Sequence, residues 1–108
     1  MFIFIPLDKK ADLGMSYDNF HQTCREACDY YRKILLEQNL KVQACVLEKL
    51  LASEDKFPII LASLPEDCVK VVQKAYLSYA DLLTEINASE YQTDILYLRW
   101  EAKFMVER

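Results

Sequence analysis

The sequence predicts an all-α fold, a small bundle of three to four antiparallel helices preceded by a short extended segment at the N-terminus. Two observations support this prediction. The 108-residue chain has a single glycine, Gly14, and three prolines, whereas sheets with tight hairpins need glycine or asparagine at several turns. Apolar residues also recur every three to four positions along most of the chain, which is the period of an amphipathic helix.

The composition favours one domain. With 53% hydrophobic and 28% charged residues the chain is typical of globular proteins, far from the polar, highly charged compositions that stay disordered. Dividing it into two cores would leave each half too small to bury enough surface. Residues 1–108 are therefore expected to form a single helical domain.

The first helix is expected to follow Ser16, a good N-cap residue. Its apolar stripe comprises Tyr17, Phe20, Cys24, Ala27, Cys28, Tyr31, Ile34 and Leu35. The stripe is interrupted at residues 37–39, and beyond it Leu40, Ala44, Leu47 and Leu51 form a differently oriented face. Either one long helix carries two apolar faces, or the chain breaks near Asn39, and the sequence leaves both alternatives open.

Three further helices are predicted in the second half. Pro58 suits a first helical turn, so a short helix is expected from Pro58 to about Ser63. The segment 64–67 starts the next helix, whose stripe runs from Cys68 to Ile86. Asn87 is interpreted as the end of that helix. Ser89 is interpreted as the N-cap of a capping box with Gln92, and the last helix then runs to about Glu107.

Two of these helices resemble each other in sequence. The pattern that begins at Ala27 and ends at Asn39 repeats from Ala75 to Asn87, at an offset of 48 residues. A duplicated helical hairpin would explain this match. Two amphipathic helices of similar composition would also align this well, and two copies do not establish a repeat.

The charge distribution disfavours a direct grip on nucleic acid. The net charge is −4, and neither half is basic: residues 1–57 hold eight Lys/Arg against nine Asp/Glu, and the rest five against eight. Phosphate backbones need clustered Lys and Arg. An acidic surface suits a basic protein partner instead, including one that itself binds nucleic acid.

The N-terminal run Met1–Ile5 is apolar but is expected to be neither a signal segment nor a membrane span, because it is short and lacks a basic lead-in. A cytoplasmic protein with no membrane partner is therefore expected. In that compartment Cys24, Cys28, Cys45 and Cys68 are expected to be reduced thiols.

His21, Cys24 and Cys28 lie at spacings that place them on one side of the first helix, so they could contribute to a soft-metal site. The two cysteines also fall in the middle of the apolar stripe, which favours core thiols without metal. His21 raises a second alternative, a histidine phosphotransfer bundle, although Cys24 and Arg25 stand where such bundles usually place other residues.

Other catalytic chemistry finds little support. With one histidine, no serine or cysteine nucleophile has a second histidine to serve it, and with one glycine there is no phosphate-binding loop. A non-enzymatic protein that needs no cofactor is therefore expected.

The last helix carries two apolar faces, one more than a helix of a small bundle normally needs. The second face, with the acidic run around the preceding turn, is the expected partner-binding surface. Its residues are Leu96, Tyr97, Trp100, Phe104, Asp81, Glu85, Glu90 and Asp94. The alternative for the apolar members is additional core, and the alternative for the acidic members is solvated charge.

These observations favour an interaction module, a small acidic inhibitor or adaptor that docks on a basic protein, similar in size, charge and helicity to phage inhibitors, anti-CRISPR proteins and nuclease-immunity proteins. This is an analogy and not a motif match. A secretion-type chaperone for a client segment is the nearest alternative, ahead of the phosphotransfer and metal-binding bundles. A homodimer through the last helix stays open.

Overall fold

The computed structural model describes residues 17–53 and 56–106, and over these ranges the fold is all-helical with no strand. The all-α prediction is confirmed. The described helices, in chain order, are α2 (Tyr17–Glu37), α3 (Lys41–Ala52), α4 (Phe57–Ser63), α5 (Glu66–Asn87) and α6 (Gln92–Val106). The five described helices are one more than the upper predicted number, because the chain breaks between α2 and α3. The short α4 agrees with the helix expected from Pro58 to about Ser63. The expected extended segment and the Ser16 cap lie outside the described residues.

The break near Asn39 decides between the two alternatives for this region. Asn39 has a positive φ of 61°, the left-handed conformation in which asparagine is tolerated better than most residues. The amide of Leu40 donates to the carbonyl of Leu35 at 2.8 Å, and the amide of Asn39 donates to Leu36 at 3.1 Å. This pair of bonds is a Schellman motif, which satisfies the last carbonyls of a helix. The chain therefore turns back here as a helical hairpin.

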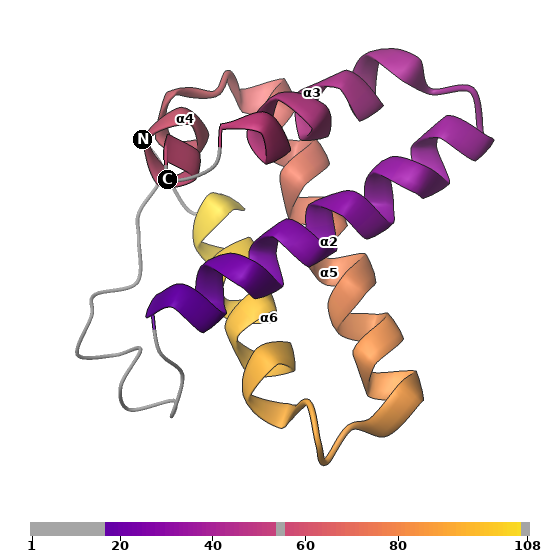
Figure 1. Ribbon diagram of the computed structural model, residues 1–108, viewed down its shortest axis with the longest axis vertical. Helices are drawn as coiled ribbons and strands as arrows, with labels where there is room; N and C mark the ends of the chain where they lie inside the picture. The colour runs from indigo at the N-terminus through magenta and orange to yellow at the C-terminus, as the bar shows by residue number, and fades with distance from the viewer. Residues whose placement is uncertain (1–16, 54–55, 107–108) are drawn as a thin grey trace.

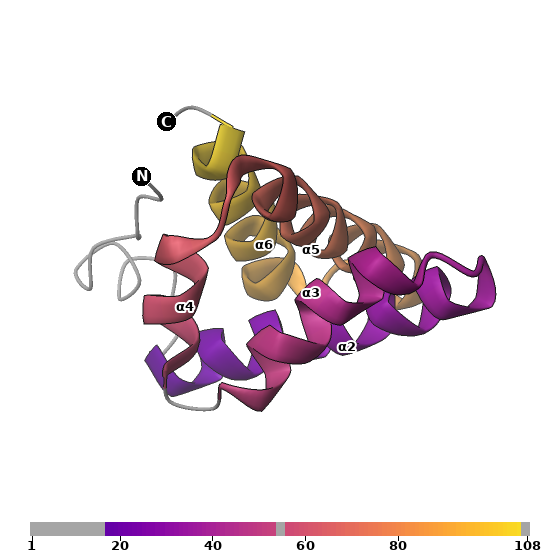
Figure 2. The same ribbon diagram turned by 90° about the horizontal axis from the view of Figure 1, so that it is seen from above.

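Two helical hairpins pack across one another. α2 and α3 form the first and α5 and α6 the second, and α2 packs on both helices of the second hairpin. In Figure 1 α2 runs diagonally across α5 and α6, and the α5–α6 turn lies at the lower end of the molecule. Seen from above in Figure 2, α4 stands at the side, next to α3.

One hydrophobic core lies where the hairpins cross. Several of its members are alanines that are almost fully buried, which lets helix axes approach closely. The buried alanines are Ala27, Ala44, Ala75, Ala80 and Ala102. Larger side chains fill the space between them, and those that are almost fully buried include Leu47, Leu50, Val72, Tyr76, Tyr97 and Leu98. Both predicted stripes, on α2 and on α5, supply this core.

The turn between α5 and α6 differs from its prediction in one respect. α5 ends at Asn87 as expected, but α6 begins at Gln92, so Ser89 is not its N-cap. The side chain of Asn87 instead bonds the residues of this turn. Its Oδ1 accepts a hydrogen bond from the Glu90 amide at 3.2 Å, and its Nδ2 donates to the Glu90 carboxylate at 3.4 Å. Asparagine competes well for such bonds because its short side chain reaches nearby amides.

No helix within residues 17–53 and 56–106 combines the length and the apolar character that crossing a membrane requires.

Candidate functional site: an acidic groove beside the α5–α6 turn

The predicted acidic residues are distributed over two sides of the second hairpin. Asp81 and Glu85 lie exposed on α5, and Glu90 lies exposed in the turn. Asp94, in the first turn of α6, is partly buried and faces α2, where its Oδ1 accepts a hydrogen bond from the Thr23 hydroxyl at 3.2 Å. Of the four predicted acidic residues, Asp94 is therefore the one that lies in a concave part of the surface.

A groove lies where α2 meets the turn end of the second hairpin. We call it the acidic groove, and its lining is Thr23, Glu26, Tyr79, Leu82, Leu83, Ile86, Tyr91 and Asp94. Its walls are mostly aliphatic and aromatic, and its ionised groups are two carboxylates, Glu26 from α2 and Asp94 from α6. Ile86 is 61% exposed at its edge. The groove thus combines apolar surface with negative charge and contains no lysine or arginine.

The two carboxylates interact electrostatically. Burial raises the pKa of Asp94, the charge of Glu26 raises it further, and the hydrogen bond from Thr23 opposes this increase. The Tyr79 hydroxyl donates to Glu26 Oε2 at 3.2 Å. Burial and the neighbouring Glu26 raise the pKa of Tyr79 to about 12, so the phenol stays protonated at neutral pH. The repulsion between the two carboxylates destabilises this part of the folded protein, and a bound cation would reduce that repulsion.

Of the eight groove residues, only Asp94 was predicted from the sequence to belong to the site. Thr23 and Glu26 are adjacent to the apolar stripe of α2, and Tyr79 belongs to the stripe of α5. A sequence signal existed in part, since Glu26 falls on the helix face next to Cys24 and Ala27, where a charged residue borders the core. What periodicity could not supply is the crossing of α2 over the second hairpin, which brings Glu26 to Asp94 and Tyr79.

The predicted apolar face of α6 is divided by the structure. Leu96 is 47% exposed, and Trp100 is partly buried and packs against the core. Tyr97 is 0% exposed, so its placement on a partner-binding surface is wrong: its side chain is buried near Glu101 and Cys24, and desolvation raises its pKa well above the usual range. The side chain of Phe104 lies outside the described residues.

Beside Leu96 a second groove follows the other side of the α5–α6 turn. Its lining comprises Thr84, Ala88, Ser89, Gln92, Ile95, Leu96 and Arg99. Arg99 bridges the two helices, with its guanidinium 3.4 Å from both Asp81 Oδ1 and Thr84 Oγ1. This groove mixes polar and aliphatic side chains and is lined by the guanidinium of Arg99, so it differs from the acidic groove in charge.

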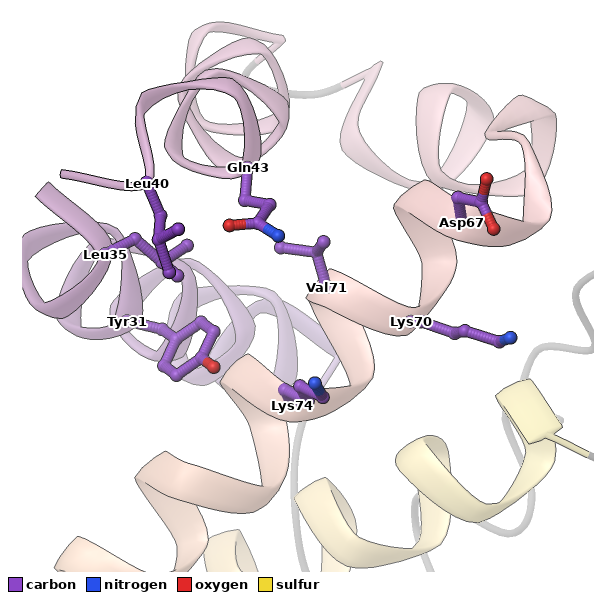
Figure 3. Close-up of a pocket in the computed structure, with 8 residues that line it drawn as sticks. All are labelled: Tyr31, Leu35, Leu40, Gln43, Asp67, Lys70, Val71 and Lys74. Atoms are coloured by element: carbon purple, nitrogen blue, oxygen red, sulfur yellow. The ribbon is translucent and has the colours of Figure 1, made fainter. Parts of the chain in front are cut away.

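A third depression lies between the two hairpins near the first turn. Figure 3 shows Tyr31 and Leu35 of α2, Leu40 and Gln43 at the start of α3, and Asp67, Lys70, Val71 and Lys74 along α5. In this view Lys70 extends away from the leucines. The depression is therefore apolar on the α2–α3 side, while its lysines belong to the exposed edge of α5.

A buried carboxylate lies in the middle of α6. Glu101 is 1% exposed, and its charge contributes to raising the pKa of both Tyr76 and Tyr97. Cys24 is hydrogen-bonded to Tyr76 in the same cluster. Nothing in the sequence around Glu101, which lies between Trp100 and Ala102, had indicated that this glutamate would be buried. These groups are closed off from solvent and lie apart from the acidic groove.

The cysteines fall into two kinds. Cys24 and Cys28 are buried in the core, and burial raises the pKa of Cys28 to about 12. Cys45 is exposed on α3 and Cys68 is partly exposed on α5. The expectation that Cys24 and Cys28 are core thiols is therefore confirmed. The side chain of His21 lies outside the described residues. Among the side chains that the structure describes, no three from His, Cys, Asp or Glu group in a way that could hold a metal ion.

Comparison with known proteins found no matching family model, no matching curated protein and no matching solved structure.

Proposed function

We propose that this chain is a non-enzymatic interaction module, a small acidic inhibitor or adaptor that docks on a basic protein through the acidic groove. The observation that supports it best is the pairing of Glu26 and Asp94 across two helices, beside the exposed Ile86. A surface that gathers like charges next to apolar side chains is well suited to a lysine or arginine whose aliphatic stem covers the apolar wall.

The remaining charges near the turn fit the same partner. Between residues 81 and 94 the chain has four acidic residues and no lysine or arginine. Glu85 and Glu90 are exposed and extend the negative field around the groove. Such a field raises the association rate of a positively charged partner, and the effect declines as salt increases.

Arginine is the better anchor of the two cations. Its planar guanidinium can donate to two carboxylates at once and can stack on an aromatic ring. The groove offers Glu26 and Asp94 as acceptors and the rings of Tyr79 and Tyr91 in its wall. We therefore expect the partner to present an arginine flanked by an apolar residue that covers Ile86.

The test compares capture of basic proteins by three forms of the chain. The wild type should retain a basic protein from an extract of the source cells, and the purified partner should then be titrated by calorimetry. Glu26→Gln combined with Asp94→Asn should weaken that binding by at least about tenfold, which corresponds to about 1.4 kcal/mol. Binding should also weaken as the salt concentration rises.

The control is Glu37→Gln combined with Glu66→Gln, which removes the same charge from exposed positions outside the groove. It should bind almost as well as the wild type. An equal loss of affinity in both double variants would mean that the groove carboxylates act only through the net charge of the protein. Unchanged binding in the groove variant would refute docking at this site.

A further inference from the structure

One face of α5 points to solvent from Lys70 to Glu85, and over this stretch it carries charged residues in a regular order. Its members, which we call the α5 stripe, are Lys70, Lys74, Leu77, Asp81 and Glu85, all exposed. At about 100° per residue these positions fall within roughly 80° of arc. The acidic groove uses Tyr79, Leu82 and Leu83, which lie on a different side of the same helix.

The charges of the α5 stripe are separated by sign. Two lysines precede Leu77 and two carboxylates follow it. Leu77 is 39% exposed at the centre. Among the described side chains Lys70, Lys74 and Glu85 form no ion pair, and Asp81 has only the exposed contact with Arg99 at 3.4 Å. The stripe therefore retains most of its charge for an external partner.

We propose that the α5 stripe binds the α5 stripe of a second copy of this chain, antiparallel, about a two-fold axis that passes beside Leu77. Positions 70 and 85, and positions 74 and 81, are symmetric about the point between residues 77 and 78. A two-fold axis there brings Lys70 opposite Glu85 of the second copy and Lys74 opposite Asp81 of the second copy. The axis repeats both pairs, which gives four opposite-charge pairs around a leucine contact.

The charge order selects this occupant over others. In a two-fold interface, if residue i of one copy contacts residue j of the other, then residue j of the first copy also contacts residue i of the second. In the α5 stripe, the residues paired in this way carry opposite charges. A parallel pairing would place lysine against lysine and carboxylate against carboxylate. A uniformly basic partner would be attracted to Asp81 and Glu85 but repelled by Lys70 and Lys74. The stripe is therefore complementary to itself.

This inference stands apart from the proposed docking function. The stripe and the acidic groove lie on different sides of α5, so dimer formation leaves Glu26, Asp94 and Ile86 accessible. In the dimer Asp81 and Glu85 pair with lysines of the second copy, while Glu26, Asp94 and Glu90 remain available to the basic partner. Because exposed ion pairs are individually weak and are screened by salt, we expect a dimer that forms at high protein concentration and low ionic strength.

The experiment uses two complementary charge reversals, K70E/K74E and D81K/E85K. Sedimentation velocity at low salt should show the wild type dimerising with concentration. Each variant alone places like charges together, so each should dimerise at least about tenfold more weakly. An equimolar mixture of the two variants again offers opposite charges at every pair and should form a mixed dimer. Circular dichroism checks that both variants keep the helical fold.

Two controls separate this surface from the others. Leu96→Ala tests self-association through α6, and E26Q/D94N tests the acidic groove, and both should dimerise like the wild type. A wild type that stays monomeric up to about 1 mM at low salt would overturn the proposal. So would variants that still dimerise alone, or a mixture that stays monomeric. Loss of dimer in E26Q/D94N would place the interface in the groove instead.

Discussion

The two interhelical turns of this molecule start from similar sequences and have different structures. Asn39 and Asn87 occupy matching positions in the 48-residue offset, and the preceding residues also match in burial, with Ala27 and Ala75 fully buried and Leu35 and Leu83 in the core. Asn39 ends α2 through its backbone, in the left-handed conformation. Asn87 stays helical and bonds the following turn through its side chain.

The difference lies in what surrounds each turn. Residues 33–41 hold two lysines and one glutamate, whereas residues 81–94 hold four acidic residues and no basic one. At the first turn Leu35 and Leu40 line one depression together, and at the second turn Ile86 is left largely exposed beside Glu26 and Asp94. Two helical hairpins of similar pattern thus leave one mixed-charge end and one acidic, partly apolar end.

The largest expected effect compares a buried and an exposed residue of α6 by their contribution to the free energy of unfolding. Tyr97→Ala removes a fully buried side chain from the interior of α6 and should lower the free energy of unfolding by about 3–5 kcal/mol. Leu96→Ala, one residue away on the exposed side, should cost under about 1 kcal/mol. Denaturant titration of both variants measures the contrast. A similar loss of unfolding free energy in both variants would mean that Tyr97 is not buried and Leu96 exposed in α6.

Glycine substitutions at Asn39 and Asn87 should change stability by an intermediate amount and with different signs at the two turns. Asn39→Gly should preserve or raise stability because glycine adopts positive φ freely. Asn39→Ala should cost about 1 kcal/mol because of its Cβ. Asn87→Gly should instead cost about 1 kcal/mol, since it places glycine in a helix and removes the bonds to Glu90. Chemical denaturation of these variants gives the signs. A stabilising glycine at both positions would contradict the difference between the turns.

The fold was largely predictable because it depends on local patterns. The spacing of Cys24, Ala27 and Tyr31 on one helix, and of Val72, Tyr76 and Tyr79 on another, identifies the core faces of α2 and α5 without any knowledge of their packing. The break at Asn39 could not be decided from the sequence, because a left-handed asparagine and a helical one look the same in a stripe analysis.

The candidate site was only partly predictable. Asp94 was found because it belongs to an acidic run, but Glu26 and Tyr79 were missed because their proximity depends on how the hairpins cross. Tyr97 was misplaced for a related reason: its helix carries two apolar faces, and periodicity cannot say which side chains of the second face become buried. Tertiary placement, rather than residue type, decides both cases.

The smallest expected effect concerns Asp94. Its pKa is raised in the folded protein by burial and by Glu26, so the folded state holds its proton more tightly than the unfolded state does. Stability from this group is therefore fully present below the unfolded pKa, about 4, and is lost as the pH rises through the raised folded pKa. Asp94→Asn should accordingly stabilise the protein at neutral pH, by about 0.5 kcal/mol or less because the groove is open to solvent.

That gain should shrink as the pH falls below the unfolded pKa of about 4, because the aspartate is then increasingly protonated in both states, and thermal melts at neutral and acidic pH measure it. Glu85→Gln makes the same charge change on exposed α5, and its gain at neutral pH should be smaller. If Asp94→Asn instead lowers stability at neutral pH, the hydrogen bond from Thr23 outweighs the repulsion by Glu26. In that case the two carboxylates are not held together at a cost, and the main support for a cation-binding groove is lost. A stabilised variant that also loses its basic partner would show that the charge at Asp94 serves binding at the expense of stability.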